Sequence, residues 1–109
     1  MPSTIPTQPF VAFAAGSAPT LNQTAVMDWG VDVTTHSMVV TGTGTLTTGA
    51  IAMQGSHDNT NWAAMGTSIT ANTTVQSTTQ ANFPCRYVRA IATVAVTGGG
   101  TVTVTLAST

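Results

Sequence analysis

Charged residues are the most conspicuous shortage in this chain of 109 residues. They make up 5% of it, against roughly 25% in an average protein, and Lys and Glu are absent. The five are Asp28, Asp32, Asp58, Arg86 and Arg89. Two arginines are too few for a nucleic-acid surface, and a net charge of −1 gives no long-range attraction to nucleic acid or to an anionic membrane. Because a net charge near zero promotes association, the composition favours part of an assembly over a free monomer.

Cysteine and long apolar runs are scarce as well. Cys85 is the single cysteine, which excludes an internal disulfide and a cysteine-built zinc cage, so packing and backbone pairing must hold the fold. No segment approaches the ~18 apolar residues of a membrane span, and no N-terminal stretch has the pattern of a signal peptide. We therefore expect a protein made in the cytoplasm, with no membrane partner.

Threonine, with serine, asparagine and glutamine in support, takes the place of the missing charges. Thr101–Leu106 alternates strictly, with Val102, Val104 and Leu106 on one side, which is the period-two pattern of a half-buried strand. No segment repeats apolar residues at helical spacing. Short strands broken by turn residues predict an all-β chain, with a single β-sandwich domain of jelly-roll type over residues 10–109.

Apolar runs and the residues that interrupt them predict the individual elements. Strands are expected at 10–15, 20–27, 31–33, 36–41, 50–53, 62–65, 86–96 and 101–106, with one or two weak strands in 66–80. Asp28-Trp29-Gly30 is predicted to be a corner, 42–49 a loop or bent edge strand, and Thr97–Gly100 a tight hairpin turn. Residues 1–9 carry three prolines and are expected to form an extended N-terminal arm, either frayed or gripping a neighbour.

The densest polar segment is Gly55–Trp62, which lies between two apolar runs. Its Gly, Ser, Asp and Asn residues predict a β-hairpin with a polar tip, followed by Trp62 as an anchor inside the sandwich. His57 and Asp58 are adjacent there, but a solvated tip leaves such groups unactivated. One carboxylate is too few for calcium, so an Asx-type turn is favoured over a metal site at Asp58–Asn61.

The remaining candidate groups are too few for an active site. His36 and His57 cannot hold zinc unless subunits share the metal, and Cys85 is expected to be a small packed residue. We therefore expect a protein that is not an enzyme, with no catalytic, cofactor-binding or metal-binding residues and no cofactor. One of the two arginines, Arg86 or Arg89, is expected to pair with an aspartate across the sandwich.

Three aromatic residues form a possible ligand platform. Trp29, Trp62 and Tyr87 could stack against a sugar, which would make a host glycan a possible partner. The chain has only six aromatic residues, however, and we expect the hydrophobic core to require most of them. Packing in the core or between subunits is the favoured interpretation.

Two segments together resemble a known family. Gly55-Ser56-x-Asp58-x-x-Asn61-Trp62, followed by Arg86-Tyr87-Val88-Arg89, resembles the paired hairpin and strand motifs of discoidin-type (coagulation factor type C) jelly rolls. The residues that carry the resemblance are Gly55, Asp58, Asn59, Trp62, Arg86, Tyr87 and Arg89. Asn59 stands where the family usually has glycine, and asparagine also tolerates left-handed turn dihedrals. The chain lacks the terminal cysteines of those domains, so their lipid or sugar binding is not carried over.

The same motifs, with the Thr/Ala/Val-rich residues 93–106, are similar to small structural proteins of tailed bacteriophages. The resemblance implies a non-enzymatic virion protein, first of all a capsid decoration protein on the capsid exterior. Such a protein would bind the major capsid protein and copies of itself, with trimers at quasi-threefold positions as the natural arrangement. A tail or tail-tip component is the alternative within this class, and a carbohydrate-binding module is the alternative from another class.

Overall fold

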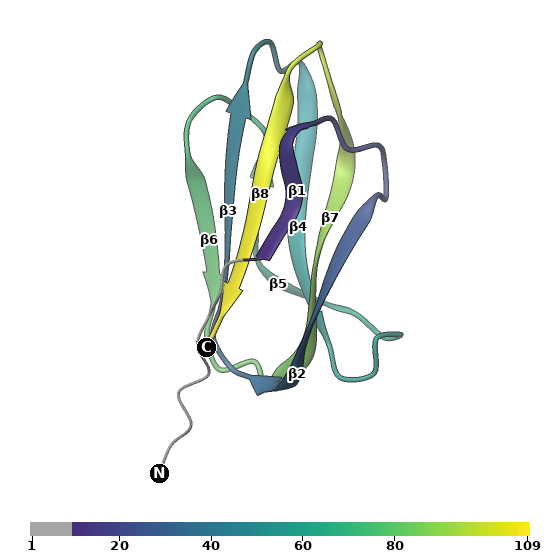
Figure 1. Cartoon of the computed structure of the whole chain (residues 1–109), viewed down its shortest axis with the longest axis vertical. Helices are drawn as coiled ribbons and strands as arrows, with labels where there is room; N and C mark the ends of the chain where they lie inside the picture. The colour runs from purple at the N-terminus through teal and green to yellow at the C-terminus, as the bar shows by residue number, and fades with distance from the viewer. Residues whose placement is uncertain (1–9) are drawn as a thin grey trace.

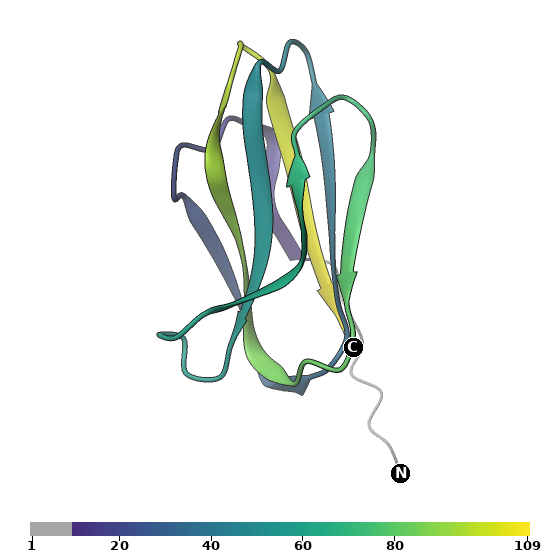
Figure 2. The same cartoon turned by 180° about the vertical axis from the view of Figure 1, so that it is seen from behind.

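The computed structural model describes residues 10–109 as two four-stranded antiparallel sheets packed face to face (Figures 1 and 2). The strands are β1 (Phe10–Ser17), β2 (Thr24–Val33), β3 (His36–Thr43), β4 (Thr48–Ser56), β5 (Ala63–Thr70), β6 (Gln76–Gln80), β7 (Cys85–Thr97) and β8 (Thr101–Ser108). The predicted all-β sandwich is confirmed. The predicted arm, residues 1–9, lies outside the described residues. No helix in residues 10–109 is long and apolar enough to cross a membrane.

The strand order is that of a jelly roll. The first sheet runs β1-β8-β3-β6 and the second sheet runs β2-β7-β4-β5. Along the chain the pairing is nested: β1 pairs with β8, β2 with β7, β3 with β6 and β4 with β5. Such nesting describes one long antiparallel ribbon wrapped into two sheets. The tip of the ribbon is the predicted β4–β5 hairpin, whose loop projects from the lower end of the sandwich in Figure 1.

The connection from β7 to β8 is not the predicted hairpin. Gly98 and Gly99 do take positive φ angles of 104° and 90°, as a tight turn requires. Yet β7 and β8 belong to different sheets, because in a wrapped ribbon each strand pairs with its nested partner rather than with its chain neighbour. The turn therefore carries the chain from one sheet to the other. The alternation in Thr101–Leu106 reflects burial of one face of β8, not pairing with β7.

Two segments predicted as interruptions from their glycines lie partly or wholly within strands. The predicted corner Asp28-Trp29-Gly30 lies inside β2, which begins at Thr24 rather than Thr20. The pairing of β2 with β7 shifts between Asp28 and Val33, and Gly30 has a φ of 79°, so this edge strand absorbs the glycine as a bulge. Strand β3 likewise continues through Gly42, where a Cβ atom would overlap the carbonyl oxygen of Asn72.

Apolar side chains at alternate positions fill the space between the sheets. The most deeply buried are at most 1% exposed and include Met38 and Val40 on β3, Ile51 and Met53 on β4, Val88, Ala90 and Ala92 on β7, and Val102, Val104 and Leu106 on β8. Residues 66–80, where one or two weak strands were predicted, hold the second part of β5 and all of β6, which lie in opposite sheets. Side chains of β6 close the gap between them: Gln80 Oε1 accepts from the Gly66 N–H, and Thr78 Oγ1 accepts from the Thr67 N–H.

Candidate functional site

The two outer faces of the sandwich differ in chemistry. On the first sheet, the outward rows formed by β3 and β8 are Ser37–Ala107, Val39–Thr105, Thr41–Thr103 and Thr43–Thr101. These rows are small, neutral and rich in hydroxyl groups. All five charged residues belong instead to β2, to β7 or to the β4–β5 loop, which are parts of the second sheet. The second sheet therefore carries the side chains with the most distinctive chemistry.

Strand register gathers polar and aromatic side chains on the outer face of the second sheet. Val26, Arg89, Gln54 and Ala64 form one row across the four strands, and Asp28, Tyr87 and Ser56 begin the next. Val88 and Ala90 are buried on either side of Arg89, so these rows face outward. Trp62 joins them because its ring lies beneath the Arg89 guanidinium. We call this surface, made of Asp28, Gln54, Trp62, Arg86, Tyr87 and Arg89, the Trp–Arg face.

Arg86 is paired with Asp28 on this face. Its Nε donates to Oδ1 of Asp28 at 2.7 Å and its Nη2 donates to Oδ2 at 2.9 Å, which is a bidentate geometry. These bonds lower the pKa of Asp28 and raise the pKa of Arg86. An arginine–aspartate pair was predicted, but its predicted position across the sandwich is wrong. Because β2 and β7 are neighbours in one sheet, the pair lies in solvent, with both side chains 44% exposed.

Arg89 has no acidic partner among the residues that the structure describes, where Arg86–Asp28 is the single salt bridge. Its Nε donates to Gln54 Oε1 at 2.7 Å, and its Cζ lies 4.2 Å from the centroid of the Trp62 ring, which is a cation–π contact. Partial burial lowers the pKa of Arg89, yet a guanidinium remains charged at any physiological pH. Arg89 therefore presents a fixed positive charge that no carboxylate neutralises.

The three aromatic residues of the predicted platform do not gather on one face. Trp62 and Tyr87 lie on the Trp–Arg face, whereas Trp29 packs against the core from the inner side of β2. The Nε1 atom of Trp29 is buried and has no hydrogen-bond partner within residues 10–109. The prediction that Trp62 anchors the interior is wrong, because Met53 and Met65 already fill the interior where β4 and β5 pair.

Asp58 holds the β4–β5 loop together. Its Oδ1 accepts from the backbone N–H groups of Thr60 and Asn61 at 2.9 and 2.8 Å, and its Oδ2 accepts from the Asn61 side-chain amide at 2.7 Å. These bonds keep the pKa of Asp58 far below its ordinary value. Asn59 has a φ of 61°, the left-handed conformation that glycine usually supplies. The carboxylate is thus used by an Asx-type turn. Within residues 10–109, no three His, Cys, Asp or Glu side chains are placed to hold a metal.

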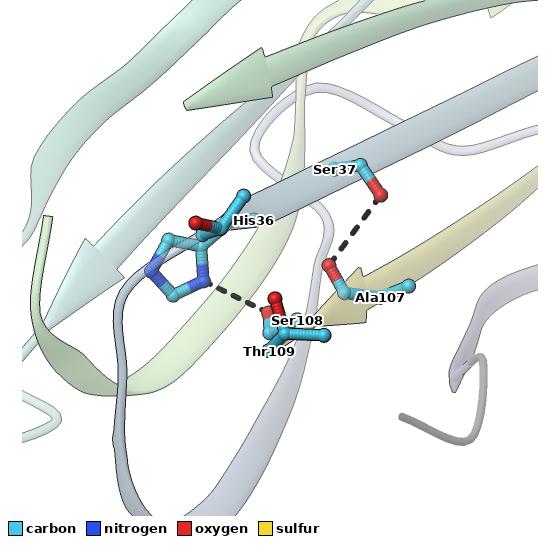
Figure 3. Close-up of a pocket in the computed structure, with 6 residues that line it drawn as sticks. His36, Ser37, Ala107, Ser108 and Thr109 are labelled. Atoms are coloured by element: carbon cyan, nitrogen blue, oxygen red, sulfur yellow. Dashed lines mark hydrogen bonds between the residues drawn. The ribbon is translucent and has the colours of Figure 1, made fainter. Parts of the chain in front are cut away.

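A buried polar cluster centred on His36 was not predicted. The His36 side chain is 0% exposed. Its Nδ1 is hydrogen-bonded to Ser108 Oγ (Figure 3), with a separation of 2.8 Å, and its Nε2 lies 2.8 Å from the carbonyl oxygen of Phe83. A carbonyl only accepts, so Nε2 carries the proton and Ser108 donates to Nδ1. Burial lowers the pKa of His36 and keeps the ring neutral. The partners are 72 and 47 residues away in the chain, so no local pattern could have indicated them.

The His36 cluster joins groups from both sheets of the sandwich. It ties β3 of the first sheet to the start of β7, where the Cys85 Sγ lies 3.5 Å from His36 Nε2. Cys85 is 0% exposed, and burial raises the pKa of its thiol, which is the opposite of an activated nucleophile. His36, Ser37, Ala107, Ser108 and Thr109 line an adjoining hollow (Figure 3). Its volume is about 220 Å³, below the ~300–1,000 Å³ of typical ligand pockets.

Comparison with known proteins places the fold. No protein-family model and no curated protein matches the chain. Among solved structures, the SPBc2 prophage-derived protein YomS is similar over 95% of this chain and 94% of its own, with a TM-score of 0.62 and 17% identity. The C-terminal domain of a chitobiase from Bacteroides fragilis is similar over 86% of this chain and 68% of its own, with a TM-score of 0.60 and 15% identity. At these identities the similarity shows a shared fold and nothing further.

Proposed function

We propose that the protein is a non-enzymatic structural component of a bacteriophage virion, and specifically a capsid decoration protein on the capsid exterior. The single observation that carries the proposal is the nearly end-to-end fold similarity to the SPBc2 prophage-derived protein, in which both chains are matched over more than nine-tenths of their length. Residues 10–109 form one sandwich of that kind. Its partners would be the major capsid protein and copies of itself.

The surface of the sandwich supports a role in an assembly. The outer rows of the first sheet carry threonine, serine, valine and alanine without a charge, and charged residues are depleted at the centres of protein interfaces. The Trp–Arg face concentrates Trp, Tyr and Arg, the residue types that dominate binding energy at interfaces. Two such faces on opposite sides of one sandwich would let it contact both a shell and a neighbouring copy.

The proposal that the protein is not an enzyme is supported by the state of its reactive groups. Cys85 and His36 are buried, and the carboxylate of Asp58 is used by hydrogen bonds within its own loop. The Asp28 carboxylate is held by Arg86. Within residues 10–109, these arrangements place no activated acid, base or nucleophile beside a pocket of ligand size.

The test is to fractionate particles of the phage that encodes the chain on a density gradient and to probe separated heads and tails for the protein. Purified protein should also bind to heads stripped of it, and should bind expanded heads better than unexpanded ones. Recovery on tails alone would favour the tail or tail-tip alternative. Absence from both fractions would contradict a virion role.

A carbohydrate-binding module is the second candidate. The observation that favours it is the presence of half-buried Trp62 and Tyr87 on one face beside the polar groups of Gln54 and Asp28, a combination suited to stacking and hydrogen bonding of a sugar. A glycan array tests it directly. Specific sugar binding that is lost in Trp62→Ala would favour the module, and an array without signal would exclude it.

A further inference from the structure

Of the five charged side chains, one cation and two anions have no ionic partner within residues 10–109. Asp28 and Arg86 bind each other, and Asp58 is held by its own loop. The remaining cation is Arg89, which contacts only Gln54 and Trp62 among its polar and aromatic neighbours in the described chain. The remaining anion is Asp32, which is exposed near the end of β2 and forms no salt bridge within residues 10–109.

Arg89 and Asp32 lie on the same sheet but at different places on it. Arg89 stands opposite Val26, in the middle of the β2–β7 pairing, whereas Asp32 is adjacent to Val33, which stands opposite Cys85 at the start of β7. The Asp28–Arg86 pair lies between them, and the negative charge of Asp32 acts on Arg86. Val33 is buried and the preceding residue, Asp32, is exposed, so the Asp32 side chain points outward at the edge of the Trp–Arg face. The outer surface is thus positive at Arg89 and negative toward the end of β2, so it is complementary to itself.

We propose that the Trp–Arg face is the surface on which a second copy of this chain docks, with Arg89 of one copy paired to Asp32 of the next. The inference deepens the proposed function and rests on it for the premise that copies associate. It specifies that copies meet through the Trp–Arg face and that an ion pair between Arg89 and Asp32 joins them. A two-fold operation that turns the face onto itself brings each Arg89 toward the other copy's Asp32, as in an isologous interface.

The apolar part of the face supports the same occupant. Trp62 and Tyr87 are half-buried in the single chain, Val26 is 38% exposed beside Arg89, and Ile91 lies half-buried in the next row. Covering these side chains would bury a central apolar patch around a charge pair that the second copy completes. Trp62 and Gln54 already hold the guanidinium in place, so little side-chain entropy is lost on docking.

Sedimentation equilibrium of the purified protein and its variants tests the proposal. The wild type should be an oligomer, and Arg89→Gln and Asp32→Asn should each weaken association by about tenfold or more, as expected for loss of one partner of an interfacial charge pair. The double variant Arg89→Asp with Asp32→Arg restores the pair with its sign reversed and should recover most of the loss. Thermal melting of each variant checks that the fold is intact, and the exposed Asp32 variants remain informative if an Arg89 variant unfolds.

Thr105→Asp, which places a charge on the outer face of the first sheet, is the matched control and should leave association unchanged. A monomeric wild type would overturn the inference. So would an oligomer that Thr105→Asp disrupts while the Arg89 and Asp32 variants leave it intact. Neither result bears on whether the protein is found in phage particles, so failure here is distinguishable from failure of the proposed function.

Discussion

His36 is the residue whose burial makes the stability of this protein depend on pH. Its neutral ring is fully enclosed, and burial lowers its pKa below the ordinary value of about 6.5. Once the pH falls below that value, the His36 imidazole of the unfolded chain binds a proton, whereas the buried ring of the folded chain stays neutral. The contribution of His36 to stability is therefore complete well above about pH 6.5 and is lost as the pH falls toward the lowered pKa of the folded state.

We predict that the free energy of unfolding falls as the pH is lowered through the ordinary histidine pKa of about 6.5, by up to about 1.4 kcal/mol per pH unit. His36→Gln should lower stability at neutral pH by about 1–3 kcal/mol, because Ser108 and the Phe83 carbonyl lose their partner. It should also flatten the pH dependence. Urea unfolding at each pH measures both effects. His57→Gln, in the exposed loop, is the control, and a flat profile in the wild type would contradict the account.

Cys85 provides a second prediction at the scale of the residue. Because its thiol is fully buried and its pKa is raised, it should not react with a thiol reagent such as DTNB while the protein is folded, and it should react fully in denaturant. The rate of modification therefore reports opening of the sandwich near the start of β7. Rapid reaction in native buffer would show that the end of the sandwich is open.

At the scale of the element, the β4–β5 hairpin was the most predictable feature. Its turn residues indicated both its place and its Asx-type turn, because their hydrogen bonds are local. Gly30 and Gly42 indicated interruptions that do not occur: β2 passes Gly30 as a bulge, and β3 runs straight through Gly42. The reasons are tertiary, namely an edge strand that tolerates irregular pairing and a close approach by Asn72. A glycine pattern alone does not distinguish these cases from a turn.

The loop of this hairpin should depend on the Asp58 carboxylate. We predict that Asp58→Ala lowers the melting temperature, because the N–H groups of Thr60 and Asn61 lose their acceptor. Asp58→Asn is the matched control: an amide oxygen can still accept from these donors, so its loss should be clearly smaller. Circular dichroism melts compare the two. Equal melting temperatures for all three proteins would show that the turn does not depend on these bonds.

At the scale of the whole molecule, the sandwich was predictable and its connections were not. Alternation located Val102, Val104 and Leu106 in the core, since burial of one strand face leaves a local pattern. The wrapping of the ribbon decides which strands pair, and it places β7 and β8 in different sheets. The prediction of a hairpin at Thr97–Gly100 was wrong for this reason. The Trp–Arg face depends on the same register: Trp62 and Tyr87 were identified as candidates, but Trp29 was wrongly grouped with them, and the contact of Arg89 with Gln54 could not be foreseen.

The central claim is that this jelly roll is a component of a virion, and its copy number is the most direct test. Quantitative mass spectrometry of purified particles of the encoding phage gives the ratio of this chain to the major capsid protein. A decoration protein is predicted to be present in an amount comparable to that of the major capsid protein and to be lost when heads are stripped. A protein absent from purified particles would contradict the account.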